Sequence, residues 1–164
     1  MPLPESALVL AGFVLAHSAW SVSDTGDLLV PLAMLERNGK REVMRFEADT
    51  QEEAVARGKT AMATLHDVDC WAFAREGLMN ESGDKIDVIS VDVGAKGLAT
   101  RITIIQRFRH LSKSQRFMLM GEPEVAVDGV VRDAGKAEDI LKVIRRGVSQ
   151  HSKVAPLWEG WHRP

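Results

Sequence analysis

Hydrophobic residues recur with two different spacings along the chain, and these spacings predict which segments are helices and which are strands. A helical spacing appears in three segments, which begin near residues 4, 50 and 133. A spacing of two residues, typical of strands that bury one face, covers most of residues 28–48 and 70–127. The predicted order is therefore helix, hairpin, helix, about four strands, helix.

The first and last predicted helices each carry a hydrophobic stripe that should lie against the core. The stripe of the first helix consists of Val9, Phe13, Ala16 and Trp20. The stripe of the last helix consists of Ala137, Ile140, Leu141, Ile144 and Val148. Between them, Thr50 and Glu53 are spaced as in a capping box, which predicts a helix start. Gly58 would let this middle helix approach the sheet closely.

The clearest local pattern is the pair Asn38-Gly39 between two strand-like runs. Both residues tolerate positive φ, so they favour a two-residue hairpin turn. That turn places Glu36 opposite Arg41, where the two charges attract each other across the strands. Pro31 has no amide hydrogen to donate, so its strand is expected at an edge of the sheet or at a bulge.

Residues 100–120 are expected to form two strands joined by a basic turn. The residues predicted to point into the core are Ile102, Ile104 and Phe108, with Gln106 among them. The residues predicted to point to the other side are Arg101, Thr103, Arg107 and Arg109, with Ile105. This alternation is typical of an antiparallel strand with one face in water.

Short antiparallel connections favour an α+β fold. We expect an antiparallel sheet of about six strands with helices packed on one face, in the order α-ββ-α-ββββ-α. Residues 1–164 should form a single domain, and residues 152–164 its C-terminal tail. The length of 164 residues is that of one ordinary domain, and the composition, 45% hydrophobic and 27% charged, is that of a globular protein.

Charge and cysteine content narrow the expected setting. The net charge of -2 shows no basic excess of the kind that polyanion binding usually requires. Cys70 is the single cysteine, so an internal disulfide cannot form and a cytoplasmic location is favoured. Residues 7–16 are apolar but no Lys or Arg precedes them, as a signal peptide would require. We therefore expect a helix packed on the domain, without membrane contact.

The most conspicuous candidate site is the basic side of the predicted strand at residues 101–109. We predict a binding or interaction module that uses this outer face of the sheet and is supported by aromatic residues in the tail. Its candidate binding residues are Arg101, Arg107, Arg109, His110, Arg116, Trp158 and Trp161. Arginine suits a carboxylate-bearing ligand, so an acidic protein, a small molecule or a second copy in a homodimer is expected as partner.

Two less specific interpretations of the same residues remain open. The arginines could simply form a solvated face that discourages edge pairing, and both tryptophans could cover the chain's own core. Nucleic acid is disfavoured as a partner because Phe108, the aromatic residue nearest the arginines, is predicted to point away from them.

An enzyme with a site assembled from distant residues is the competing class. Its candidate residues are His66, Cys70, Asp87, Asp92, Arg107 and His110. The odd spacing of Asp87 and Asp92 predicts opposite faces of one strand, so they should not act as a pair. His66 and Cys70 lack any nucleophile motif, and a buried cysteine is the simpler expectation. No cofactor and no metal site is predicted.

Overall fold

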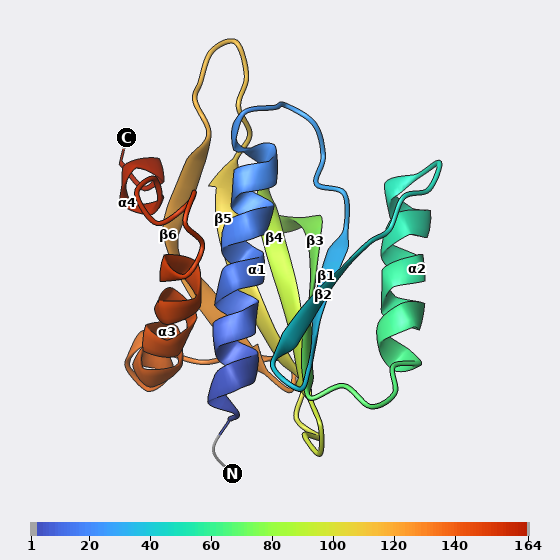
Figure 1. The fold of residues 1–164 in the computed structure, drawn as a ribbon. Coiled ribbons are helices and arrows are strands. Elements are labelled where there is room, and N and C mark those ends of the chain that lie inside the picture. Colours follow the sequence, from blue (N-terminus) through green and yellow to red (C-terminus); the bar gives the residue numbers. More distant parts are fainter. Residues whose placement is uncertain (1–2, 164) are drawn as a thin grey trace.

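The computed structural model describes residues 3–163 and confirms an α+β fold (Figure 1). The helices are α1 (Glu5–Ser23), α2 (Gln51–Ala63), α3 (Ala134–Ser149) and α4 (Trp158–Trp161). The strands are β1 (Leu32–Arg37), β2 (Lys40–Arg45), β3 (Cys70–Glu81), β4 (Asp84–Ala95), β5 (Ile102–Arg109), β6 (Met118–Val127) and β7 (Val130–Val131). Two short elements, β7 and α4, add to the expected order.

All seven strands form one antiparallel sheet in the order β2-β1-β3-β4-β5-β6-β7. The predicted hairpin register is confirmed, because Glu36 lies opposite Arg41 and their side chains form an ion pair of 3.2 Å. The edge position expected for the strand near Pro31 is wrong, since β1 lies between β2 and β3. Pro31 precedes β1, where only its carbonyl is needed: it accepts a hydrogen bond from the amide of Phe46 at 2.9 Å.

The helices cover both faces of the sheet rather than one. Cys70, Ala72 and Ala74 of β3 pack in the cluster that contains α1 and α3. Phe73 points to the opposite face, where it meets α2. A Cβ on Gly58 would lie only 2.2 Å from the Phe73 ring, so this glycine permits the predicted close approach. Helix α2 therefore stands on the other side of the sheet from α1 (Figure 1).

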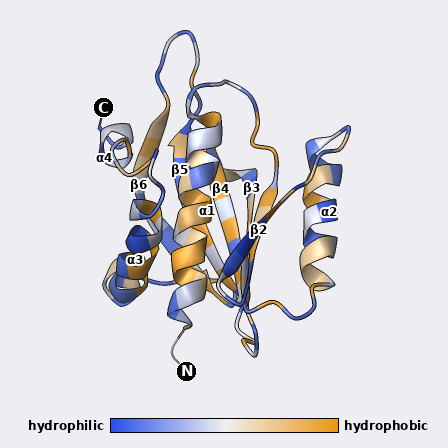
Figure 2. Ribbon diagram, in the orientation of Figure 1, coloured by the Kyte–Doolittle hydropathy of each residue, from blue (hydrophilic) through white to orange (hydrophobic). Residues whose placement is uncertain are grey.

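Helix α1 is buried on nearly every side, so its predicted stripe does not define its sheet-facing side. The residues of α1 that pack over the sheet include Leu10, Val14 and Leu15, whereas Phe13 and Trp20 of the predicted stripe are half-buried and contact His151. Figure 2 shows hydrophobic residues along most of this helix. By length and composition α1 could also cross a membrane, but a core helix meets the same test, and 67% of its apolar window is buried.

Two glycines allow α1 and α3 to cross in close contact. A Cβ on Gly12 would lie 2.0 Å from the carbonyl oxygen of Ile144, and one on Gly147 would lie 2.0 Å from that of Val9. Both distances are far below van der Waals contact. The two helices therefore lie backbone against backbone beside the sheet.

The expected C-terminal tail packs on the body of the protein. After α3 the chain makes a series of turns and then forms α4, in which Trp158 and Trp161 contact each other with ring centroids 6.3 Å apart. Trp161 also meets the buried ring of Phe117 edge-on, at 5.2 Å. Both tryptophans pack against the hydrophobic core, so the interpretation in which they cover the chain's own core describes their position.

Candidate functional site

The face of the sheet opposite α1, over strands β3 to β6, is here called the outer face. Its alternation with the buried face is the predicted one: along β5 every second residue from Ile102 to Phe108 is buried. Cross-strand pairing places Arg75, Ser90, Ile105 and Glu124 in one row across the four strands. Arg107 lies in the next row, beside Met120 of β6.

The central arginines of the outer face are paired with carboxylates of the same face. Arg107 forms ion pairs with Glu81 and with Glu124, the latter at 2.6 Å. Burial opposes the charged form of Arg107, but the hydrogen bonds to the two glutamates outweigh it, so the pKa of Arg107 is raised above its ordinary value. Arg75 binds Asp92 at 2.6 Å.

The exposed arginines lie at the two ends of β5. Arg101 and Arg109 are exposed, and neither forms an ion pair within residues 3–163. The outer face is therefore a network of paired charges with one available guanidinium at each end of β5, rather than a continuous basic stripe. This pattern weakens the case for a phosphate backbone as ligand, because the central cation is already neutralised.

His110 and Arg116 do not join the outer face. Arg116 donates a hydrogen bond to the carbonyl of Gly160 at 3.0 Å and thereby helps to hold α4. His110 turns toward the side of the sheet that carries α1, where it meets Glu76. The predicted binding residues are thus divided between the outer face, the α4 region and a buried cluster.

Trp158 of α4 borders an open hollow of about 420 Å³ between α3, α4 and a bulge of β6. Trp158 and His162 line it together with Arg145, which is held by Glu122 and Glu138 at 3.1 Å each. The hydrogen bond to Glu138 is the largest cause of the raised pKa of Arg145, and it outweighs partial burial. These charges are satisfied within the protein.

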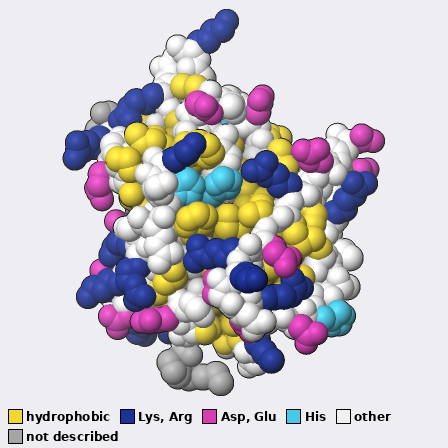
Figure 3. Space-filling model, in the orientation of Figure 1, with side chains coloured by type: hydrophobic (Ala, Val, Ile, Leu, Met, Phe, Trp, Pro, Cys, Tyr) yellow, Lys and Arg dark blue, Asp and Glu magenta, His cyan; other side chains and the backbone are white. Residues whose placement is uncertain are grey.

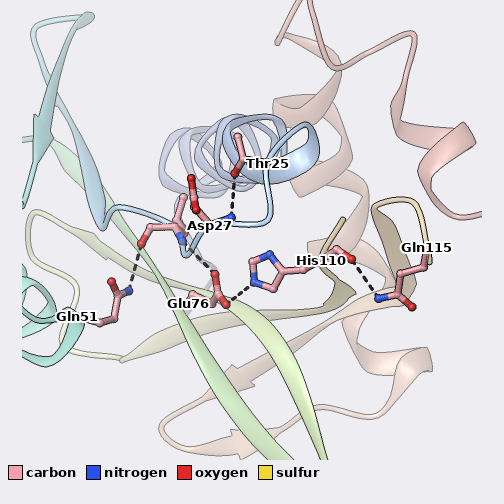
Figure 4. Close-up of polar contacts among 7 residues, drawn as sticks. Thr25, Asp27, Gln51, Glu76, His110 and Gln115 are labelled. Carbon is pink, nitrogen blue, oxygen red and sulfur yellow. Dashed lines mark hydrogen bonds and ion pairs between the residues drawn. The ribbon is translucent and has the colours of Figure 1, made fainter. Parts of the chain in front are cut away.

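The third group is a partly buried cluster of Glu76, Asp87 and His110, here called the Glu76 cluster. Figure 4 shows Glu76 and His110 of this cluster turned toward each other. Glu76 belongs to β3 and its side chain is 4% exposed. One of its oxygens lies 2.6 Å from His110 Nε2, and the other accepts the amide hydrogen of Leu29 at 3.0 Å. Donor atoms of the three clustered side chains lie within 4.8 Å of one another.

Strand register explains why these polar groups meet inside the protein. Strand β1 begins opposite Ala74, so Glu76 extends beyond it and faces the loop between α1 and β1. The backbone amide of Leu29 in this loop donates a hydrogen bond to the Glu76 carboxylate. The side chain of Gln51 in α2 donates to the carbonyl of Leu29 at 3.1 Å. Gln115 donates to the carbonyl of His110 at 3.1 Å from the far side (Figure 4). Glu76 and Gln51 thus hold the loop at Leu29, and Gln115 fixes the backbone of His110.

Sequence reasoning identified Asp87 and His110 but missed Glu76. The alternation along β3 contained the necessary information, because Cys70, Ala72 and Ala74 point to the buried face and Glu76 continues that series. A carboxylate at a predicted core position needs a partner, and this requirement could have drawn attention to it.

The other residues of the predicted enzyme site lie apart from this cluster. His66 is exposed in the loop before β3, and Asp92 is on the outer face, opposite in direction to Asp87 as predicted. Cys70 is buried and free. Burial, followed by the nearby charge of Glu36, raises the pKa of the Cys70 thiol to about 11, so it stays protonated and is a poor nucleophile at neutral pH.

A second histidine contact, also missed, joins α1 to the segment after α3. His17 Nδ1 and His151 Nε2 are 3.1 Å apart, and Phe13 and Trp20 flank them. In the view of Figure 3, histidine side chains lie among hydrophobic side chains near the middle of the molecular surface. Burial is the main reason that both histidines have a pKa below the ordinary value.

Comparison with known proteins adds no family to this description. No family model matches the sequence, and no curated protein or solved structure matches the chain. The structure itself describes an α+β domain with an open antiparallel face and a partly buried carboxylate–histidine cluster.

Proposed function

We propose that the protein is a small cytoplasmic binding module that acts through the outer face of its sheet, with a second copy of itself as the partner. The observation that carries this proposal is the composition of that face. Half-buried apolar side chains, among them Met79, Ile105 and Met120, lie between charges of both signs. On this side of the sheet, helix α2 packs against residues of β1 and β3.

The charge arrangement favours self-association over an acidic ligand. A two-fold symmetric contact requires a surface that is complementary to itself. The outer face supplies Glu124 near its centre, Glu81 at the end of β3, and the exposed Arg101 and Arg109 at the ends of β5. An antiparallel rotation of one copy over another would bring exposed guanidinium groups toward carboxylates. The same arrangement offers a highly charged nucleic acid no continuous basic track.

A mass measurement tests the proposal. Light scattering on the full chain at increasing concentration should give a mass approaching twice 18.1 kDa. Ile105→Glu should weaken the dimer about 10-fold or more, because it buries an unpaired charge at the centre of the contact. The matched control is Val43→Glu, at an exposed position of the edge strand β2, which should leave the dimer unchanged. A monomer mass at all concentrations would refute the proposal.

A further inference from the structure

The Glu76 cluster places two carboxylates close together without a permanent positive charge. Neither Glu76 nor Asp87 forms an ion pair with any Lys or Arg of residues 3–163. The carboxylate of Glu76 is almost completely buried, and an unbalanced buried carboxylate is costly. Among residues 3–163, His110 is the titratable base that contacts it. A bound cation would balance both acidic groups.

The spacing of the donor atoms suits a metal ion. Ligand atoms about 2.0–2.2 Å from a zinc ion stand roughly 3–4 Å from each other. Donor atoms of Glu76, Asp87 and His110 all lie within 4.8 Å of one another. Glu76 Oε2 and His110 Nε2 lie 2.6 Å apart, closer than two ligands of one zinc ion, so the pair would open slightly to admit the metal ion.

The imidazole of His110 uses only one of its two nitrogens within the protein, since Nε2 meets Glu76. His110 Nδ1 is buried and has no hydrogen-bond partner within the described residues. Buried polar atoms are normally satisfied, so the ring of His110 is not completed by the protein alone. Glu76 also lines an open hollow of about 370 Å³ beside α2, together with Gln51, Glu52 and Lys59. This hollow brings solvent to the Glu76 side of the cluster.

We infer that Glu76, Asp87 and His110 form a binding site for a first-row divalent transition metal such as Zn²⁺. An imidazole nitrogen with two carboxylate oxygens suits these ions better than Mg²⁺ or Ca²⁺, which prefer oxygen ligands alone. Three protein ligands leave a further coordination position for water or another small ligand. The inference does not depend on the proposed function, because the cluster lies on the opposite side of the sheet from the outer face.

Calorimetric titration of the chelator-treated full chain with Zn²⁺ tests the inference. We expect one ion per chain, and no comparable heat with Mg²⁺ at the same concentration. Asp87→Asn should reduce the affinity for Zn²⁺ about 10-fold or more. This change should leave the fold intact, because Asp87 makes no hydrogen bond or ion pair with other described side chains. His110→Gln should reduce the affinity in the same way.

Two controls separate this site from other histidines. His66→Gln alters an exposed side chain far from the cluster, and His17→Gln breaks the other histidine contact. Both variants should bind Zn²⁺ as the unaltered protein does. Absence of binding, or binding that His17→Gln abolishes and Asp87→Asn leaves unchanged, would overturn the inference.

Discussion

The contact between His17 and His151 requires at least one neutral ring. One nitrogen must donate and the other accept across the 3.1 Å that separates them. Burial lowers the pKa of His17 most, followed by the charges of His151 and Arg45. Burial also lowers the pKa of His151, as does Lys153, although a backbone hydrogen bond opposes them. His17 and His151 therefore bind protons less readily in the folded protein than in the unfolded chain.

The free energy of unfolding should consequently fall as the pH drops below about 6.5, the ordinary histidine pKa. Above that pH neither state is protonated and the stability is complete. Below it the unfolded chain binds protons first, and the loss continues until the folded histidines titrate at their lower pKa. Urea unfolding at several pH values should show a smaller loss for His17→Gln than for the unaltered chain.

At neutral pH the same His17→Gln variant should be less stable by about 1 kcal/mol, the value of one hydrogen bond. His66→Gln is the control, since its exposed ring should leave the pH dependence unchanged. Identical pH profiles for the unaltered chain and His17→Gln would contradict this account.

At the scale of elements, local sequence patterns correctly predicted the hairpin turn and the start of α3. The turn at Asn38-Gly39 fixes the register of the β1–β2 hairpin, because both residues adopt positive φ. Asp133 accepts the amide hydrogen of Lys136 at the start of α3, where the helix was predicted to begin. The orientation of α1 was mispredicted because a helix that is apolar almost all round gives no preferred stripe. Only the shape of its neighbours selects the side that meets the sheet.

The crossing of α1 and α3 gives a prediction about these elements. Gly147→Ala should reduce stability by about 1–3 kcal/mol, because the added methyl group would overlap the backbone of Val9 and force the helices apart. This cost should exceed the gain in helix propensity that alanine brings, about 1 kcal/mol.

Chemical denaturation of Gly147→Ala measures that cost, with Gly160→Ala in α4 as the matched control. A Cβ on Gly160 would meet nothing within 4 Å, so the control should be as stable as the unaltered chain or slightly more stable. Equal stability of the two variants would show that the crossing is looser than described.

At the scale of the whole molecule, the sequence predicted the class and much of the order but not the distribution of helices between the faces. Phe73 and Ala72 alternate along β3 whichever face each helix covers, so periodicity cannot assign α2 to a side. The same limit applies to the candidate sites. Glu76 and His110 come together through the pairing of β3 with β4 and of β4 with β5, a relation that no local pattern contains.

The packing of α4 also belongs to this scale. Deleting residues 156–164 would remove Trp158 and Trp161 and uncover Phe117, which is 3% exposed in the intact fold. Stability should fall by about 2–4 kcal/mol from lost burial, measured as a lower unfolding midpoint in urea. The dimer should persist once the chain is folded, because the outer face is untouched. An unchanged midpoint would show that α4 contributes no burial.

The meeting of α1 with α3 has a kinetic consequence. His17 and His151 are 134 positions apart, and Glu5 reaches Arg146 across 141 positions. Closing loops of that length costs chain entropy, which the contacts between the helices offset only after they have formed. We expect the strands to assemble first and the two helices to dock late, which leaves α1 open to intermolecular association while refolding proceeds. Dilution should therefore raise the refolding yield more than a change of temperature does.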